Sequence, residues 1–273
     1  MQLLQITVMT NKTEPSWASP RLVESTSECK FYHAFEYPDG TSVEGDWDLR
    51  QAFGDYSGNV DVSGKRVLDM GTASGFMSFA FEQHGATVVS ADVESTVQYT
   101  KVPYYDDISQ TDRALYLKRS GIALERMKNS YWYSWHKFES KAQVYYGDLI
   151  NLPSWIGMFD IGFIGQIMVH NRDPLGLLQA VAERTTDTLI ISEGMEPRDE
   201  NLIRFIPNNE SERRPHGWFR FTTGTLCSFL KLMGFEIVSQ KTVEYRNVVM
   251  NRQTPITTIV AKRLPNTLPT HIN

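Results

Sequence analysis

The stretch "KRVLDMGTASGFMSFAFEQHG", residues 65–85, decides the fold of this chain. It begins with a short apolar run that is typical of a buried strand and stops at Gly71. A small-residue stretch leads to Gly75, and apolar residues at helical spacing then run over 76–85 and end at another glycine, as helices commonly do. The stretch therefore predicts a strand, a tight turn and a helix in direct succession.

The same alternation continues along the chain. Further strands are expected at 86–93, 141–149, 159–167 and 187–194, and helices at 111–141, 174–185 and 222–235. "EIVSQKTVEYR" (236–246) and "TPITTIVAKR" (254–263) are then two strands in succession. Alternating strands and helices imply a mostly parallel sheet that is covered on both faces. We predict an α/β protein with a Rossmann-like, doubly wound, mostly parallel seven-stranded sheet, an antiparallel C-terminal edge hairpin and an N-terminal lid segment.

The chain divides into three segments by composition. Residues 1–27 are rich in Ser, Thr and Pro and predict a flexible tail. Residues 28–63 contain aromatics and the turn signals "YPDG" and "FGDYSGN", which predict a packed cap segment. Residues 64–273 hold the alternating pattern and predict a single folded domain.

Bulk properties limit the class of partner. The net charge of −5 argues against a general nucleic-acid binder, although this net charge is compatible with a local basic groove. The opening "MQLLQITVM" has no preceding basic residues, and no 18-residue apolar run occurs, so we expect neither a signal peptide nor a membrane partner. Cys29 and Cys227 lack neighbours at metal-ligand spacing, which predicts a reducing, cytoplasmic location and no metal.

Small and acidic residues at the first two strand ends predict a nucleotide-type cofactor. Ligands of such sheets bind outside the carboxyl ends of the strands. Gly71, Ala73 and Gly75 let the backbone approach a ligand closely, and Asp92 lies about 20 residues further on, where an acid suits ribose hydroxyls. A dinucleotide fingerprint would have glycine in place of Ala73, and Asp69 would repel a pyrophosphate. Asp69 suits a cationic amino group instead, which favours S-adenosylmethionine.

Two later strand ends extend the predicted cofactor site. Asp148 in "GDL" could accept a hydrogen bond from the adenine amine, and Gln166 lies near the end of the fourth strand, beside the sulfonium end. Val93 and Leu149 come directly after the two acids. The alternative is that each aspartate only caps a helix or a turn.

These motifs resemble those of a known family. "VLDMGTASGFMSF", "VVSADV", "YYGDL" and "FDIGFIGQIMVH" are similar to successive cofactor motifs of the class I S-adenosylmethionine-dependent methyltransferases over roughly residues 65–195. "FYHAFEYPDG", "VHNRDPLGLL" and "GWFRFTTGTLCSFLKLMGF" resemble the wobble-uridine tRNA methyltransferase/carboxymethyltransferase group and its small relatives. The resemblance implies a single Rossmann-like methyltransferase domain, S-adenosyl-L-methionine as cofactor and a cap over the active site. The tRNA enzymes have a larger N-terminal part, so the short, acidic chain favours a small-molecule substrate.

Two histidines are the candidate catalytic residues. His170 ends the fourth strand and could be the general base that an alcohol or a protonated amine needs, or a polar residue that only closes the strand. His33 lies with Tyr32 in the segment that the resemblance places over the site, as a substrate contact or as a packed lid residue. Trp132 and Trp135 could form an aromatic wall that attracts a cation, although aromatics at this spacing also pack helices.

The remaining substrate candidates follow the later strands. Glu193 could bind a substrate amine or only make a turn, and Arg172 could anchor the substrate. Asn208 and Trp218 lie in a long polar loop of the kind that often forms a lid. We expect a methyltransferase that acts on N, S or O of a small polar metabolite, an amino acid or natural-product intermediate. The alternatives are a tRNA wobble-uridine methyl/carboxymethyltransferase and a catalytically silent cofactor-binding scaffold. The oligomeric state stays open.

Overall fold

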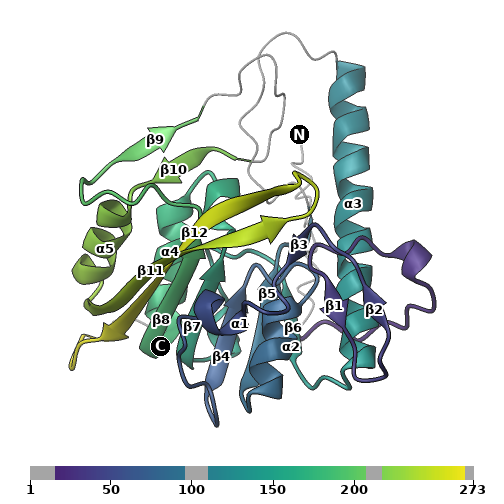
Figure 1. The fold of residues 1–273 in the computed structure, drawn as a ribbon, viewed down its shortest axis with the longest axis horizontal. Coiled ribbons are helices and arrows are strands. Elements are labelled where there is room, and N and C mark those ends of the chain that lie inside the picture. Colours follow the sequence, from purple (N-terminus) through teal and green to yellow (C-terminus); the bar gives the residue numbers. More distant parts are fainter. Residues whose placement is uncertain (1–15, 96–109, 207–216, 268–273) are drawn as a thin grey trace, which may run out of the picture.

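An eight-stranded sheet forms the centre of the molecule (Figure 1). The computed structural model describes residues 16–95, 110–206 and 217–267, with only the backbone for 110–117. The strands of the large sheet lie in the order β3-β11-β12-β8-β7-β4-β5-β6. Their bounds are β3 Trp47–Asp48, β4 Arg66–Met70, β5 Thr87–Asp92, β6 Gln143–Tyr146, β7 Phe159–Gly165, β8 Thr185–Glu193, β11 Phe235–Asn247 and β12 Arg252–Arg263.

Helices and two small hairpins complete the structure. The helices are α1 Phe53–Tyr56, α2 Phe76–Gln83, α3 Gln110–Lys137, α4 Pro174–Arg184 and α5 Thr223–Leu232, with 3-10 turns η1 Thr26–Glu28, η2 Ser154–Ile156 and η3 Met168–His170. The hairpins are β1 Phe35–Glu36 with β2 Ser42–Val43, and β9 Ile203–Phe205 with β10 Phe219–Phe221.

The sheet is parallel in its central part and antiparallel at one side. β6, β5, β4, β7 and β8 are neighbours with parallel pairing, and β12 and β11 follow as the antiparallel hairpin. The predicted Rossmann-like order is therefore confirmed, with one more strand than the seven expected. The additional strand is β3, whose Trp47 and Asp48 pair with Asn247 and Arg246 of β11. Two residues are too short to show an alternating pattern, so the sequence contained no signal for β3.

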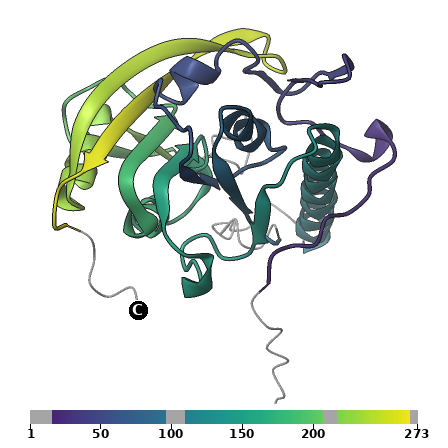
Figure 2. The ribbon, with the colours of Figure 1, turned by 90° about the horizontal axis from the view of Figure 1, so that it is seen from below.

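Two apolar layers cover the faces of the sheet (Figure 2). α4 and α5 pack on one face through residues such as Leu177 and Leu226, and α1 and α2 pack on the other through residues such as Tyr56 and Phe79. α3 lies beside the β6 edge and contributes to both layers. Asp173 caps α4: its side chain accepts a hydrogen bond from the Gly176 backbone, and a proline opens the helix.

The N-terminal part of the described chain packs against the sheet and its helices. Residues 1–15 of the predicted tail lie outside the described residues. From Trp17 onward the chain contacts the domain: its ring lies 4.8 Å from that of Trp155, and the Ala18 amide donates to the Val144 carbonyl of β6. Phe35 of the cap packs against Phe79 of α2. The predicted cap segment 28–63 thus forms β1, β2, β3 and α1.

The carboxyl ends of the five parallel strands define one edge of the sheet, here called the rim. The chain runs outward from β4 through β5 to β6 on one side, and β7 and β8 lie on the other side. The order therefore reverses between β4 and β7. Ligands of open α/β sheets bind at such a switch point.

Candidate cofactor and acceptor site

The loop after β4 is a tight backbone turn at the rim. The amides of Gly71 and Thr72 both donate to the Ala91 carbonyl of β5, at 2.8 and 3.2 Å. Gly71 and Gly75 have φ angles of 83° and 90°. A Cβ on Gly71 would lie 2.5 Å from the Ile167 side chain, so packing against the loop after β7 excludes any other residue there.

Left-handed backbone occurs on both sides of the switch point. Ala73, after β4, has a φ of 50°, and Gln166, after β7, has a φ of 49°. This conformation is uncommon for residues other than glycine and asparagine. The remaining non-glycine positions of this kind in the described chain are Asn59, Asn251, Asn266 and Glu139. Strained backbone at two facing loops is a feature of ligand sites.

Asp92 holds the strained loop from the neighbouring strand. Its Oδ2 accepts a hydrogen bond from the Ala73 amide at 2.8 Å, and its Oδ1 accepts one from the Val93 amide at 2.7 Å. The residue is 4% exposed, and burial raises its pKa. Each carboxylate oxygen has two acceptor positions, so each keeps one for a ligand. The pair of oxygens therefore matches a pair of ribose hydroxyls.

Asp69 lies beneath the loop. Its Oδ2 accepts a hydrogen bond of 2.5 Å from Ser78 of α2, and the polar chain continues through Ser90 to Tyr131. Burial raises the pKa of Asp69 to about 6. The carboxylate thus ties the loop to α2, and its expected contact with a ligand ammonium stays a prediction.

Asp148 and the two hydrophobic candidates occupy different environments. The Asp148 carboxylate is exposed and accepts hydrogen bonds from the Ile150 amide at 2.9 Å and from the Asn151 side chain at 2.8 Å, which is a local turn cap. Val93 and Leu149 are buried below the rim. The adenine contact of Asp148 stays a prediction.

Glu193 ends β8 as a fully buried carboxylate. Its Oε2 accepts a hydrogen bond from the Met168 amide at 3.0 Å, and its Oε1 accepts one from Gly194 at 3.1 Å. Burial raises its pKa to about 7. Glu193 therefore caps η3, the short turn that carries His170. Glu193 thus has the turn role that the sequence left open, and it is also a titratable group at the rim. Its predicted contact with a substrate amine stays a prediction.

His170 lies on η3 and not at the end of the strand, because β7 already ends at Gly165. The side chain is half-buried, and its amide donates to Ile167 at 3.0 Å. The Trp218 amide donates to the Val169 carbonyl, which fixes the β9–β10 hairpin beside this turn. Arg172 is exposed two residues beyond, and Asn208 lies outside the described residues.

His33 brings the cap onto the cofactor loop. Its amide and its Nδ1 lie 3.0 and 3.1 Å from the Ser74 hydroxyl. Burial lowers the pKa of His33 to about 3, so the imidazole is neutral at physiological pH. The Tyr32 ring packs edge-on against it at 4.9 Å. His33 of the cap thus contacts the loop after β4, while its predicted role in substrate contact or catalysis stays a prediction.

The two tryptophan candidates lie in helix packing. Trp132 is 1% exposed and packs against Tyr131 and Trp135. The Trp135 indole donates to the Ala142 carbonyl, just before β6 begins. That position is at the amino end of the strand, away from the rim. The alternative interpretation, in which these aromatics pack α3, describes what the structure shows.

Two rim residues were missed by the sequence interpretation. Ser74 holds His33, and Tyr56 reaches the ends of β7 and β8. Tyr56 lies in "FGDYSGN", which had been interpreted only as a turn signal. Its aromatic character inside a turn-rich motif was the available clue.

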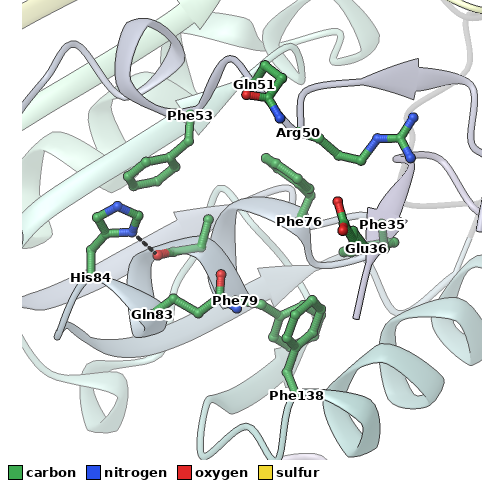
Figure 3. Close-up of a pocket in the computed structure, with 11 residues that line it drawn as sticks. Phe35, Glu36, Arg50, Gln51, Phe53, Phe76, Phe79, Gln83, His84 and Phe138 are labelled. Carbon is green, nitrogen blue, oxygen red and sulfur yellow. Dashed lines mark hydrogen bonds between the residues drawn. The ribbon is translucent and has the colours of Figure 1, made fainter. Parts of the chain in front are cut away.

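A cavity of about 180 Å³ lies on the outer side of α2 (Figure 3). Phenylalanine rings dominate its lining, and His84 stacks on Phe53 with ring centroids 4.3 Å apart. The Arg50 guanidinium at its border is paired with Asp48. The cavity runs along the helix to its C-terminal end at Gln83 and His84, so it is distinct from the rim.

The chain matches no family model, and no curated protein matches it by sequence. Several solved structures are similar to it. A magnesium protoporphyrin IX methyltransferase from Synechocystis with bound S-adenosylmethionine is 15% identical, with a TM-score of 0.49 over 79% of this chain and 78% of that one. A putative RNA methyltransferase from Pyrococcus horikoshii is 14% identical, with a TM-score of 0.46 over 78% and 85%.

A third solved structure is the 1,6-didemethyltoxoflavin-N1-methyltransferase of Burkholderia thailandensis, with bound substrate and S-adenosylhomocysteine. It is 16% identical to this chain, with a TM-score of 0.46 over 79% of this chain and 77% of that one. The strand order and the pairing of the large sheet by themselves define the chain as a Rossmann-like α/β protein.

Proposed function

We propose that the protein is an S-adenosylmethionine-dependent methyltransferase. The observation that carries the proposal is the arrangement at the switch point: left-handed Ala73 and Gln166 follow the adjacent strands β4 and β7, and Asp92 supports Ala73 while keeping acceptor positions on both oxygens. A nucleoside fits this arrangement, with its ribose on Asp92 and its reactive end toward Gln166.

The charge of the rim favours a cationic nucleoside. Asp69, Asp92 and Glu193 are all at least 96% buried, and none of the ion pairs between described residues includes them. Buried carboxylates without a cation are costly in the ionised state. S-Adenosylmethionine carries a sulfonium and an ammonium, whereas a nicotinamide dinucleotide would bring its pyrophosphate into this acidic rim.

The chemistry asks the protein mainly for positioning. Methyl transfer from a sulfonium is an in-line displacement, and orientation with exclusion of water can supply a large part of the rate. Tyr32 and His33 of the cap pack on the cofactor loop and exclude water there. His170 on η3 is the residue we assign as base for an acceptor that must lose a proton.

We propose a small polar metabolite as the acceptor. The net charge of −5 supports this choice over a wobble-base tRNA, whose binding would also decrease steeply with salt. None of the helices among the described residues is long and apolar enough to cross a membrane. Within the same residues, no group of three or more His, Cys, Asp or Glu side chains could hold a metal.

Calorimetry with S-adenosylmethionine tests the proposal directly. We expect binding with a dissociation constant in the micromolar range or lower, typical of cofactor sites, and no binding of nicotinamide dinucleotides. Transfer of a labelled methyl group to components of a metabolite extract then separates an enzyme from a silent cofactor-binding scaffold. Absence of S-adenosylmethionine binding by the folded protein would refute the proposal.

A further inference from the structure

Tyr56, the last residue of α1, brings a phenol to the switch point. Its carbonyl accepts a hydrogen bond of 2.6 Å from the hydroxyl of Ser192, next to the end of β8. Its own hydroxyl lies 3.3 Å from the position that a Cβ would take on Gly165, the last residue of β7. α1 therefore fixes the phenol against the ends of two adjacent strands.

The hydroxyl of Tyr56 has no partner of its own in the described chain. The side chain is 4% exposed, and the hydrogen bonds between described residues involve only the Tyr56 backbone. The ring packs against Phe163 at 5.8 Å and against Tyr245 at 5.3 Å, contacts that a phenylalanine would also make. The fully buried hydroxyls without a partner among the described residues belong to Tyr146, Tyr245 and Thr254, and Tyr56 is not among them. The Tyr56 hydroxyl therefore keeps some accessible surface, which a ligand at the end of β7 can reach.

The surroundings of this hydroxyl are acidic. The ionisable neighbours with the largest influence on Tyr56 are Tyr32, Glu193, Tyr245 and Asp69, and with burial as the main cause they raise its pKa. Such surroundings repel a carboxylate or a phosphate and attract an ammonium group. Tyr32 and Tyr56 also present aromatic faces, which attract cations.

We propose that the methyl acceptor is an amine, and that Tyr56 and Glu193 bind its nitrogen. This inference rests on the proposed methyltransferase function and narrows it from N, S or O to N. Tyr56 accepts a hydrogen bond from the ammonium through its unpartnered hydroxyl oxygen. Glu193 keeps one acceptor position after its bonds to the backbone amides of Met168, Val169 and Gly194.

The reaction then balances without a further reagent. The bound ammonium gives one proton to the imidazole of His170, the base assigned above, and becomes a neutral amine. The nitrogen lone pair attacks the methyl carbon, and the carbon–sulfur bond breaks with its electron pair moving to sulfur. The products are a methylated ammonium and neutral S-adenosylhomocysteine, and His170 releases its proton to solvent.

The test uses the full chain, labelled S-adenosylmethionine and three acceptor pools. The pools are primary and secondary amines including free amino acids, a mixture of carboxylates, phenols and thiols, and bulk tRNA. Tyr56→Phe removes only the hydroxyl. Tyr245→Phe is the matched control, because it removes a buried hydroxyl without a partner from the neighbouring ring. Thermal unfolding of both variants verifies that they fold.

We expect label only in the amine pool. Tyr56→Phe should lower kcat/KM for the labelled amine at least tenfold and leave the dissociation constant of S-adenosylmethionine within twofold. Tyr245→Phe should lower kcat/KM by less. Label in either of the other pools, equal effects of the two variants, or no labelled amine while the cofactor binds would each overturn the amine proposal. Failure to bind the cofactor would instead refute the methyltransferase function beneath it.

Discussion

Replacing Asp92 with asparagine tests the cofactor site at its central carboxylate. The two side chains have the same size, but asparagine has one acceptor oxygen where Asp92 uses two, for the amides of Ala73 and Val93. One of these amides must therefore face the asparagine NH₂ group. The substitution also removes the negative charge at the position assigned to the ribose.

The magnitude follows from the bonds lost. A buried donor left without its acceptor costs about 1–3 kcal/mol of stability. Burial raises the pKa of Asp92, so the neutral amide also relieves some desolvation, and we expect the loss of stability near the lower value. For the cofactor, hydrogen bonds to a charged group contribute about 1.5–3 kcal/mol, which corresponds to roughly 10- to 150-fold weaker binding.

Two measurements on two variants separate these effects. Urea unfolding gives the stability, and calorimetry gives the affinity for S-adenosylmethionine. Asp148→Asn is the matched comparison, because Asp148 also accepts two backbone amides but is exposed. We expect it to change stability by less than Asp92→Asn. Cofactor affinity within twofold of the unmodified protein for Asp92→Asn would refute the ribose assignment.

Four further predictions concern the rim and its supports. The raised pKa values of Glu193, about 7, and Asp69, about 6, favour their neutral forms in the free protein, so its stability should decrease as pH rises from about 4.5 to 7. Affinity for cationic S-adenosylmethionine should increase over the same pH interval, and affinity for neutral S-adenosylhomocysteine should increase much less. Calorimetric titrations of both ligands measure this, and an equal response of the two would contradict it. His170→Ala should lower turnover at least tenfold with cofactor affinity unchanged, and a collapse of that affinity would instead assign the residue to the cofactor wall. Gly71→Ala should destabilise the fold by about 1–3 kcal/mol, because its Cβ would meet Ile167 2.5 Å away, and an unaltered unfolding midpoint would disprove that packing argument. Asp173→Ala should cost about 1 kcal/mol in the same assay, as the loss of a helix cap does, with transfer activity retained.

The architecture was predictable wherever a pattern repeats along the chain. Alternating strands and helices located all the parallel strands, and the helix predicted over 174–185 corresponds to α4. β3 escaped prediction because Trp47 and Asp48 form a strand only by pairing with β11, far away in the sequence. Tertiary pairing of this kind leaves no local signal.

Which residue types lie at the rim was predictable from the sequence, but the directions of their side chains were not. The strand-end rule located Asp92 and Glu193, because carboxyl ends of parallel strands share one edge. It could not show that Asp69 faces Ser78 below the loop, since neighbouring strand positions alternate between faces and the helix partner is set by packing. The left-handed backbone of Gln166 was also invisible, because side-chain identity does not specify φ there.

The cap, near the start of the chain, is joined to the C-terminal hairpin, near its end. Trp47 and Asp48 pair with β11, and the Val248 amide donates to the Asp46 carbonyl. The cap segment is therefore synthesised early, but it can pair with β11 only after the last strands have left the ribosome. Activity should appear late during synthesis, and a protease that removes the C-terminal hairpin should open the site from the opposite end of the chain.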